Sequence, residues 1–131
     1  MIQVLAPKTL GQIHMLKCNL PSCGVARFLI LLDGPWATLI VRELLRGPQR
    51  FSELRTSLTG ISAHTLTHRL RRFEKSGLVM RTAYAETPPK VIYELTELGK
   101  SLEPILLTMN NWGQNIPDDV LRSAIVNDNE M

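Results

Sequence analysis

The most informative stretch of the chain, residues 51–75, reads FSELRTSLTGISAHTLTHRLRRFEK. Its apolar spacing predicts a short helix over 51–58 and a longer one over 63–75, separated by a glycine-containing turn at 59–61. Ser62 precedes the second helix and is suited to cap it, because a serine hydroxyl accepts a hydrogen bond from a free N–H of the first turn. Two helices joined in this way are the outline of a helix-turn-helix motif.

One side of the predicted helix 63–75 is apolar and the other is polar. At about 100° per residue, the side chains that gather toward the core are Ala63, Leu66, Leu70 and Phe73. The side chains on the opposite side are His64, His68, Arg71 and Lys75. Short polar groups near the N-terminus, with cations further along, suit a helix that lies in the major groove of DNA.

We predict two kinds of DNA contact from this segment. Base edges are contacted by His64, Thr65 and His68. Phosphates, or the flanks of the groove, are contacted by Arg69, Arg71 and Arg72. The candidate set is completed by Ser62 and Thr67. Any surface helix carries some charge, so a solvated face without a DNA partner is the alternative interpretation. The neighbouring helix, turn and hairpin favour DNA.

The segments that follow predict a β-hairpin. Residues 78–84 and 91–95 have strand-like composition, and the loop between them contains two consecutive prolines that exclude a helix or a central strand. A hairpin directly after a helix-turn-helix is a wing. The wing residues expected to contact phosphate or enter the minor groove are Arg81, Thr87 and Lys90. A hairpin that is merely exposed to solvent is the alternative.

Helices are also predicted on the N-terminal side. Residues 23–32 have the apolar density of a buried helix, which the Asp-Gly-Pro sequence at 33–35 ends. Pro35 then begins a second helix that runs to about residue 46. Residues 1–22 are interpreted as an arm with one or two helical turns between positions 10 and 17.

The C-terminal side is predicted to hold one amphipathic helix, over about 100–112. The apolar face of this helix is formed by Leu102, Ile105, Leu106 and Met109. It ends near Trp112, whose large side chain a monomer of this size is expected to leave exposed to solvent. The polar tail after residue 113 either forms a further helix over about 118–125 or frays.

Composition limits the possible classes of protein. The 131 residues include 44% hydrophobic and 21% charged residues, which fits one globular domain. Residues 42–90 contain ten Lys and Arg against four Asp and Glu, a net charge of +6, whereas the rest of the chain carries −3. A basic middle between acidic flanks suits a polyanion partner. Without an apolar run of about 18 residues or a signal-like start, we expect no membrane partner and a cytoplasmic location.

No catalytic motif is apparent in the sequence. It lacks a phosphate-binding glycine loop, a plausible pair of carboxylates and a nucleophile elbow, so we predict that the protein is not an enzyme and needs no cofactor. His64 and His68 have the i, i+4 spacing of metal ligands, but no third ligand is evident. We therefore predict no metal site.

Read in order, the stretch from Cys23 to Gly113 resembles the HxlR family of transcriptional regulators. The matching pieces are Cys23, Gly34-Pro35-Trp36, LLRGPQRFSEL at 44–54, Gly60-Ile61-Ser62, LTHRL at 66–70, PPKVIYELTELG at 88–99 and Trp112-Gly113. The resemblance implies an α+β, mainly α, winged helix-turn-helix with flanking dimerisation helices. The implied segments are an arm (1–22), a DNA-binding domain (23–99) and a C-terminal dimerisation helix with its tail (100–131).

The same resemblance implies a homodimer on double-stranded DNA with a palindromic operator. Two-fold symmetry would place the two recognition helices about 34 Å apart. Repression is the commoner mode in the family, with activation open. The alternative interpretation of the final helix is that it packs on the core of its own chain and not on a partner.

Many members of the family carry a cysteine near the first helix, and Cys23 matches that position. A helix N-terminus and Arg27, one turn on, both favour the thiolate, the form that an oxidant or electrophile attacks. Gly24 departs from the proline that the family often has after this cysteine. Cys18 is a resolving thiol, a partner across the dimer or an inert residue of the arm.

Two other functions fit the sequence. One is a MarR-like regulator that a small ligand releases from DNA, which requires a pocket between the base of the wing and the final helix. The other is a winged-helix module that binds proteins and not DNA. Such a module would tolerate the loss of Arg71 and Arg72, whereas a DNA-binding protein would not.

Overall fold

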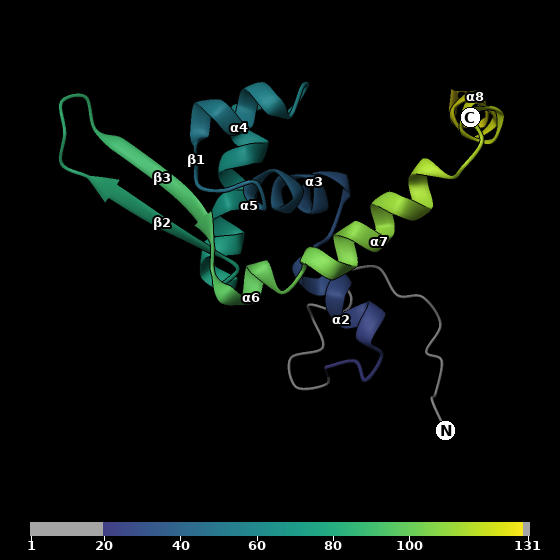
Figure 1. Ribbon diagram of the computed structural model, residues 1–131, viewed down its shortest axis with the longest axis horizontal. Helices are drawn as coiled ribbons and strands as arrows, with labels where there is room; N and C mark the ends of the chain where they lie inside the picture. Colours follow the sequence, from purple (N-terminus) through teal and green to yellow (C-terminus); the bar gives the residue numbers. More distant parts are fainter. Residues whose placement is uncertain (1–19, 130–131) are drawn as a thin grey trace.

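The computed structural model describes residues 20–129 of the chain and confirms the winged helix-turn-helix (Figure 1). The elements in chain order are α2 (Gly24–Leu31), α3 (Pro35–Leu44), β1 (Gln49–Arg50), α4 (Phe51–Ser57), α5 (Ala63–Ser76), β2 (Val79–Tyr84), β3 (Lys90–Leu95), α6 (Glu97–Lys100), α7 (Glu103–Gln114) and α8 (Asp118–Asn129). Helices α4 and α5 form the helix-turn-helix, and β2 and β3 form the wing.

The ends of α5 are fixed by local hydrogen bonds and backbone geometry. Ser62 Oγ accepts a hydrogen bond from the backbone N–H of Thr65 at 3.0 Å, as expected of an N-terminal cap. At the other end Gly77 has φ +83°, a left-handed conformation that glycine adopts without strain. The recognition helix therefore spans almost the predicted range, 63–75.

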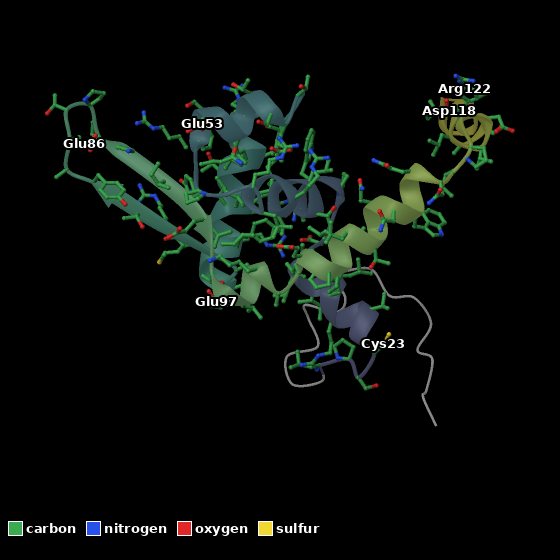
Figure 2. The ribbon with its side chains drawn as sticks, in the orientation of Figure 1. Cys23, Glu53, Glu86, Glu97, Asp118 and Arg122 are labelled. Carbon is green, nitrogen blue, oxygen red and sulfur yellow. The ribbon has the colours of Figure 1, made fainter. Side chains whose placement is uncertain are left out.

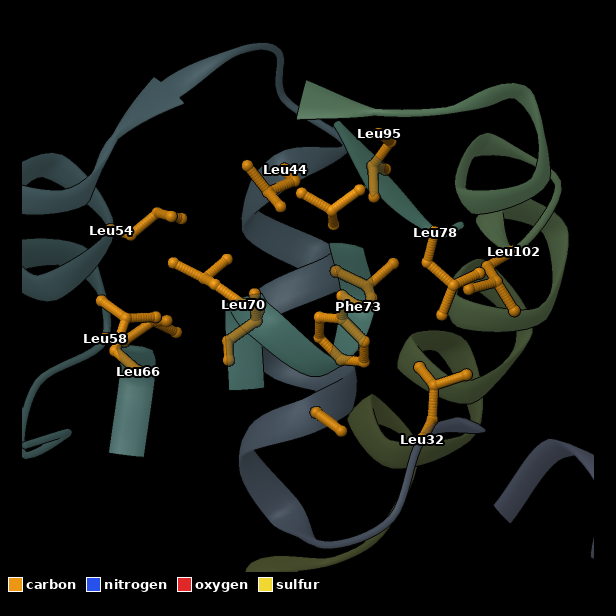
Figure 3. Close-up of a cluster of buried hydrophobic side chains, with 14 of the residues drawn as sticks. Leu32, Leu44, Leu54, Leu58, Leu66, Leu70, Phe73, Leu78, Leu95 and Leu102 are labelled. Atoms are coloured by element: carbon orange, nitrogen blue, oxygen red, sulfur yellow. The ribbon is translucent and has the colours of Figure 1, made fainter. Parts of the chain in front are cut away.

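The core lies where α3, α4 and α5 meet the wing and α7 (Figure 3). Leu66, Leu70 and Phe73 project from α5 into it and are at most 1% exposed. Ala63 was predicted to join them but is exposed, because it occupies the first helical position, beyond the edge of the core. The other residues at the centre of the core, all below 2% exposed, include Ala37, Ile40, Val41, Leu54 and Leu78.

The sheet has three strands, in the order β1-β3-β2, and both pairs are antiparallel. The wing hairpin pairs Val79 with Leu95 at its base and Tyr84 with Lys90 at its outer end. Strand β1 was not predicted. Its two residues follow a Gly-Pro stop and carry no alternating pattern, so only their pairing with β3 defines them as a strand.

The C-terminal helix begins later than predicted and is preceded by a separate short helix. Thr96 caps α6 by accepting from the N–H of Gly99, and Gly99 packs so closely on the Leu78 carbonyl that a side chain there would overlap it. Pro104, in the first turn of α7, starts the next helix. The predicted single apolar face is therefore wrong in part. Leu102 and Leu106 are buried, whereas Ile105 and Met109 are 45% and 47% exposed.

Helix α2 also departs from its predicted role, because none of its residues is buried. Val25 is 69% exposed, and only Phe28 packs partly against the core. The predicted buried helix is therefore a surface helix, and within 23–32 only Leu32, directly after α2, is buried in the core. The predicted helical turns at 10–17, within the arm, lie outside the described residues. The tail forms α8, the first of the two alternatives considered for it.

No single described helix is long and apolar enough to cross a membrane, and the pair α2 and α3, which would pass together on composition, is bent by 79°.

Candidate nucleic-acid interface

The outward face of α5 carries a continuous polar stripe, defined here as His64, His68, Arg71 and Lys75. All four side chains are exposed, and they recur every three or four residues along the helix. The stripe lies opposite Leu66, Leu70 and Phe73, so core packing directs it to solvent. This arrangement agrees with the helical wheel and presents hydrogen-bonding and cationic groups along the length of α5.

Two of the predicted DNA-contacting residues at the start of α5, Ser62 and Thr65, form hydrogen bonds within its N-terminal cap. Ser62 Oγ donates to Thr65 Oγ1 at 2.9 Å while it accepts from the Thr65 N–H. Thr65 and Thr67 are partly buried, whereas Ser62 is exposed. The hydroxyls of Ser62 and Thr65 therefore stabilise the N-terminus of α5.

Two of the three predicted arginines are bound to a carboxylate that the sequence analysis did not select. Arg69 Nη1 donates to Asp33 Oδ1 at 2.6 Å, and Arg72 Nη1 lies 3.0 Å from both Asp33 oxygens. These side chains are only 18% (Arg69) and 32% (Arg72) exposed. Arg71, in contrast, points outward in the stripe. We refer to Asp33, Arg69 and Arg72 as the Asp33 cluster.

Electrostatics within the Asp33 cluster favour the charged carboxylate. Burial by itself would raise the pKa of Asp33, but the hydrogen bonds from Arg72 and Arg69, together with their positive charges, hold that pKa below its usual value. The ion pairs therefore contribute stability above the ordinary pKa of aspartate, and this contribution is lost as the pH falls through the lowered pKa. The lowered pKa keeps the Asp33 carboxylate ionised at neutral pH.

The predicted DNA-contacting residues of the wing lie at different positions along the hairpin. Arg81 and Thr87 are exposed, with Thr87 in the loop at the outer end, where the Thr87–Pro88 peptide bond is cis. Lys90 is partly buried, and its Nζ lies 5.7 Å from the centre of the Tyr84 ring, in a cation–π contact. Arg81 and Thr87 are thus accessible to a ligand, while Lys90 already has an intramolecular contact.

Cys23 is the N-cap residue of α2, so its predicted position at a helix N-terminus is confirmed, and its side chain is exposed. The Arg27 guanidinium, expected to favour the thiolate, donates instead to the backbone oxygen of Pro21 at 3.2 Å. Cys18 lies outside the described residues. Figure 2 shows Cys23 at the start of α2 and Glu86 at the outer end of the wing, on opposite sides of the molecule.

Asp33 and β1 are the parts of this region that sequence reasoning missed. A signal for Asp33 existed, since it is a single acid at the end of the apolar run 23–32. Arg69 also lies nearer the apolar side of the wheel than the stripe does. Within residues 20–129, no group of three or more His, Cys, Asp or Glu side chains is placed to hold a metal ion.

A helix-turn-helix whose second helix presents a polar stripe, followed directly by a β-hairpin, defines a winged-helix transcriptional regulator that binds DNA. The family described as "HxlR-like helix-turn-helix" matches residues 31–120, and the chain belongs to this family. Relatives of similar length agree. The chain is 40% identical over 105 residues to the HTH-type transcriptional regulator YybR of Bacillus subtilis. The aligned region covers 80% of this chain and 83% of YybR.

Solved structures show the same fold. The redox regulator HypR in its reduced form matches with a TM-score of 0.70 and 40% identity, over 77% of this chain and 99% of HypR. The reduced form of the transcriptional regulator YodB from Bacillus subtilis matches with a TM-score of 0.62 and 36% identity, over 72% of this chain and 93% of YodB. A structure of diamide-treated YodB matches with a TM-score of 0.60.

Proposed function

We propose that this protein is a homodimeric repressor that reads a palindromic operator with α5 and leaves it when Cys23 is modified by an oxidant or electrophile. The observation that carries the DNA-binding part is the exposed stripe of α5, held opposite a fully buried apolar face. Such a helix fits the width of the major groove. We place this activity in the cytoplasm, where a thiol is kept reduced until a signal arrives.

Within the proposed complex, the stripe divides by chemistry. His64 and His68, nearer the N-terminus of α5, read base edges, and Arg71 with Lys75 neutralises phosphates. Arg81 and Thr87 of the wing contact the adjacent backbone or minor groove. Lys90 would have to leave Tyr84 to join them. Arg69 and Arg72 are assigned to the Asp33 cluster and not to phosphates, which revises their expected role.

Exposed apolar side chains support the homodimer. They lie on α2 and α7, in the part of the molecule away from the wing (Figure 1). The largest exposures there are those of Val25 (69%), Leu107 (55%) and Trp112 (72%). A soluble protein rarely leaves so many large apolar side chains together in water, and a second copy would cover them. Dimerisation would also pair two copies of α5 for a two-fold operator.

The thiol part of the proposal rests on position and on relatives. Cys23 is exposed at the N-terminus of α2, where a small oxidant or electrophile can reach its thiol. HypR is described as a redox regulator, and YodB has been studied after diamide treatment. Because α2 also carries part of the exposed apolar surface, a change at Cys23 would act next to the proposed dimer interface.

The test is a fluorescence anisotropy titration of the full chain against DNA from its own upstream region, before and after diamide. We expect tight, competitor-resistant binding that diamide abolishes and reductant restores, and we expect Cys23→Ser to bind DNA without responding to diamide. Cys18→Ser is the matched variant that shows whether the second thiol takes part. Binding that ignores diamide in the wild type would disprove the thiol switch and leave the DNA-binding assignment intact.

A second prediction separates base-reading from phosphate-binding residues. Arg71→Ala should weaken binding to specific and random DNA equally and make the slope of log affinity against log salt shallower by about one, since one phosphate contact is lost. His68→Ala should lower affinity for the specific site by about 1–3 kcal/mol with little effect on random DNA. Anisotropy titrations over a salt series measure both. Equal losses on both DNAs for both variants would contradict the assignment.

One observation favours a second candidate function, a regulator released by a small ligand. A groove of about 470 Å³ lies between α3 and α7, and its lining combines four leucines and Met109 with polar and charged residues that include Arg42 and Arg46. Its volume is in the range of small-molecule sites. It does not reach the base of the wing, and the pocket predicted between the base of the wing and the final helix is therefore not this groove. A ligand that releases DNA at full thiol reduction would favour this function over the redox switch.

A further inference from the structure

Asp33 contacts the recognition helix through charge and not through apolar packing. It lies in the loop between α2 and α3, and its carboxylate binds two side chains of α5, Arg69 at 2.6 Å and Arg72 at 3.0 Å. The Asp33 side chain is 17% exposed, so this ion-pair cluster is more sheltered than an ordinary surface ion pair. Charge-assisted hydrogen bonds of this kind are short and directional.

The spacing of the two arginines determines what the cluster restrains. Residues three apart on a helix lie on one flank, about one turn from each other. A single carboxylate bound to both therefore resists rotation of α5 about its axis and sliding along it. The apolar contacts of Leu66, Leu70 and Phe73 hold α5 against the core but are less directional. Core packing thus decides which side of α5 faces solvent, and the Asp33 cluster adds a directional restraint on its rotation and sliding.

The cluster is adjacent in sequence to the DNA-facing stripe. His68 precedes Arg69, and Arg71 precedes Arg72, so fixing the two bound arginines also fixes where their neighbours point. Gly34 makes room for the cluster, because a Cβ atom there would lie 2.9 Å from Arg69 Nη2, and its φ of +82° suits glycine. A hydrogen bond to a base edge tolerates only a few tenths of an ångström, so orientation determines readout.

We propose that Asp33 is a positioning residue for sequence recognition, which orients the stripe of α5 and keeps Arg69 and Arg72 away from phosphates. This inference rests on the proposed DNA-binding function. Asp33 itself does not touch DNA in this arrangement. Its removal would therefore change the discrimination between DNA sequences more than it changes affinity for DNA in general.

The test compares full-length variants on two duplexes, one selected by the wild type from a random pool and one with that sequence scrambled. For Asp33→Asn we expect about tenfold weaker binding to the selected duplex and equal or tighter binding to the scrambled one. The salt dependence on the scrambled duplex should steepen, because freed arginines reach phosphates. Asp33→Glu, which keeps the charge, should restore most of the discrimination. Glu97→Gln, which removes an exposed carboxylate of α6, is the matched control and should leave both affinities unchanged.

Circular dichroism establishes that each variant is folded at the temperature of the titration. If Asp33→Asn does not fold, Arg72→Gln provides the same test, because it removes one of the two ion pairs. It should reduce discrimination without a shallower salt dependence; a shallower one would mean that Arg72 contacts phosphate, and would overturn the inference. Equal losses on both duplexes, or no loss for Asp33→Asn, would also overturn it. A wild type that selects no duplex would overturn the proposed function, and this inference with it.

Discussion

Replacing Trp112 with aspartate is expected to convert the proposed dimer into a monomer and to lower operator affinity about a hundredfold or more. Trp112 is 72% exposed in the protomer, so its replacement removes little from the core. In a dimer that covers this side chain, an unpaired carboxylate would be buried at a cost of several kcal/mol. Loss of the dimer also removes the local concentration that holds the second recognition helix at its half-site.

Analytical ultracentrifugation measures the oligomeric state, and anisotropy on a full operator and on a half-site measures binding. The Trp112→Asp variant should bind both DNAs with similar, weak affinity. Leu98→Asp introduces the same charge at another exposed apolar residue, on α6, and should remain dimeric. A Trp112→Asp protein that stays dimeric would place the interface elsewhere on the surface.

Replacing Phe73 with alanine is expected to destabilise the domain by about 3–5 kcal/mol. Phe73 is 1% exposed and lies at the centre of the core, where α5 meets the surrounding leucines (Figure 3). Truncation leaves a cavity that the packed neighbours cannot close. Because domains of this size are stable by only about 5–15 kcal/mol, much of the stability would be lost, and DNA binding would fall with the folded fraction.

Urea unfolding followed by circular dichroism measures this loss as a lower midpoint. The control is Met80→Ala, on the 47% exposed side chain of β2, which should change the free energy of unfolding by about 0.5 kcal/mol or less. A loss below about 1 kcal/mol for Phe73→Ala would mean that α5 is not held by the core as described.

The recognition helix was predictable because its signals are local. The cap at Ser62, the left-handed Gly77 and the repeat of Leu66, Leu70 and Phe73 each act within a few residues, so the sequence carries them directly. The stripe of α5 followed from the same repeat. The position of Cys23 at a helix N-terminus was also correctly predicted, because the beginning of an apolar helical segment is a local sequence signal.

Other features depended on contacts between distant parts of the chain. Apolar density in 23–32 indicated burial, yet whether α2 lies inside or outside depends on what packs over it, and nothing in the described protomer buries it. The periodicity of 100–112 did not show that Leu106 faces the core while Ile105 faces out. Strand β1 exists only through its partner β3.

The sequence by itself therefore determined the order of elements, the winged helix-turn-helix and the outward face of α5, since helical periodicity and turn chemistry are local properties. Only the tertiary structure decided which charges on α5 are free. Arg69, Arg71 and Arg72 are the same residue type within one turn, but Asp33, more than thirty positions earlier, binds two of them. An ion pair between distant segments forms only when packing brings the charges together, and a local sequence pattern does not predict which charges those are.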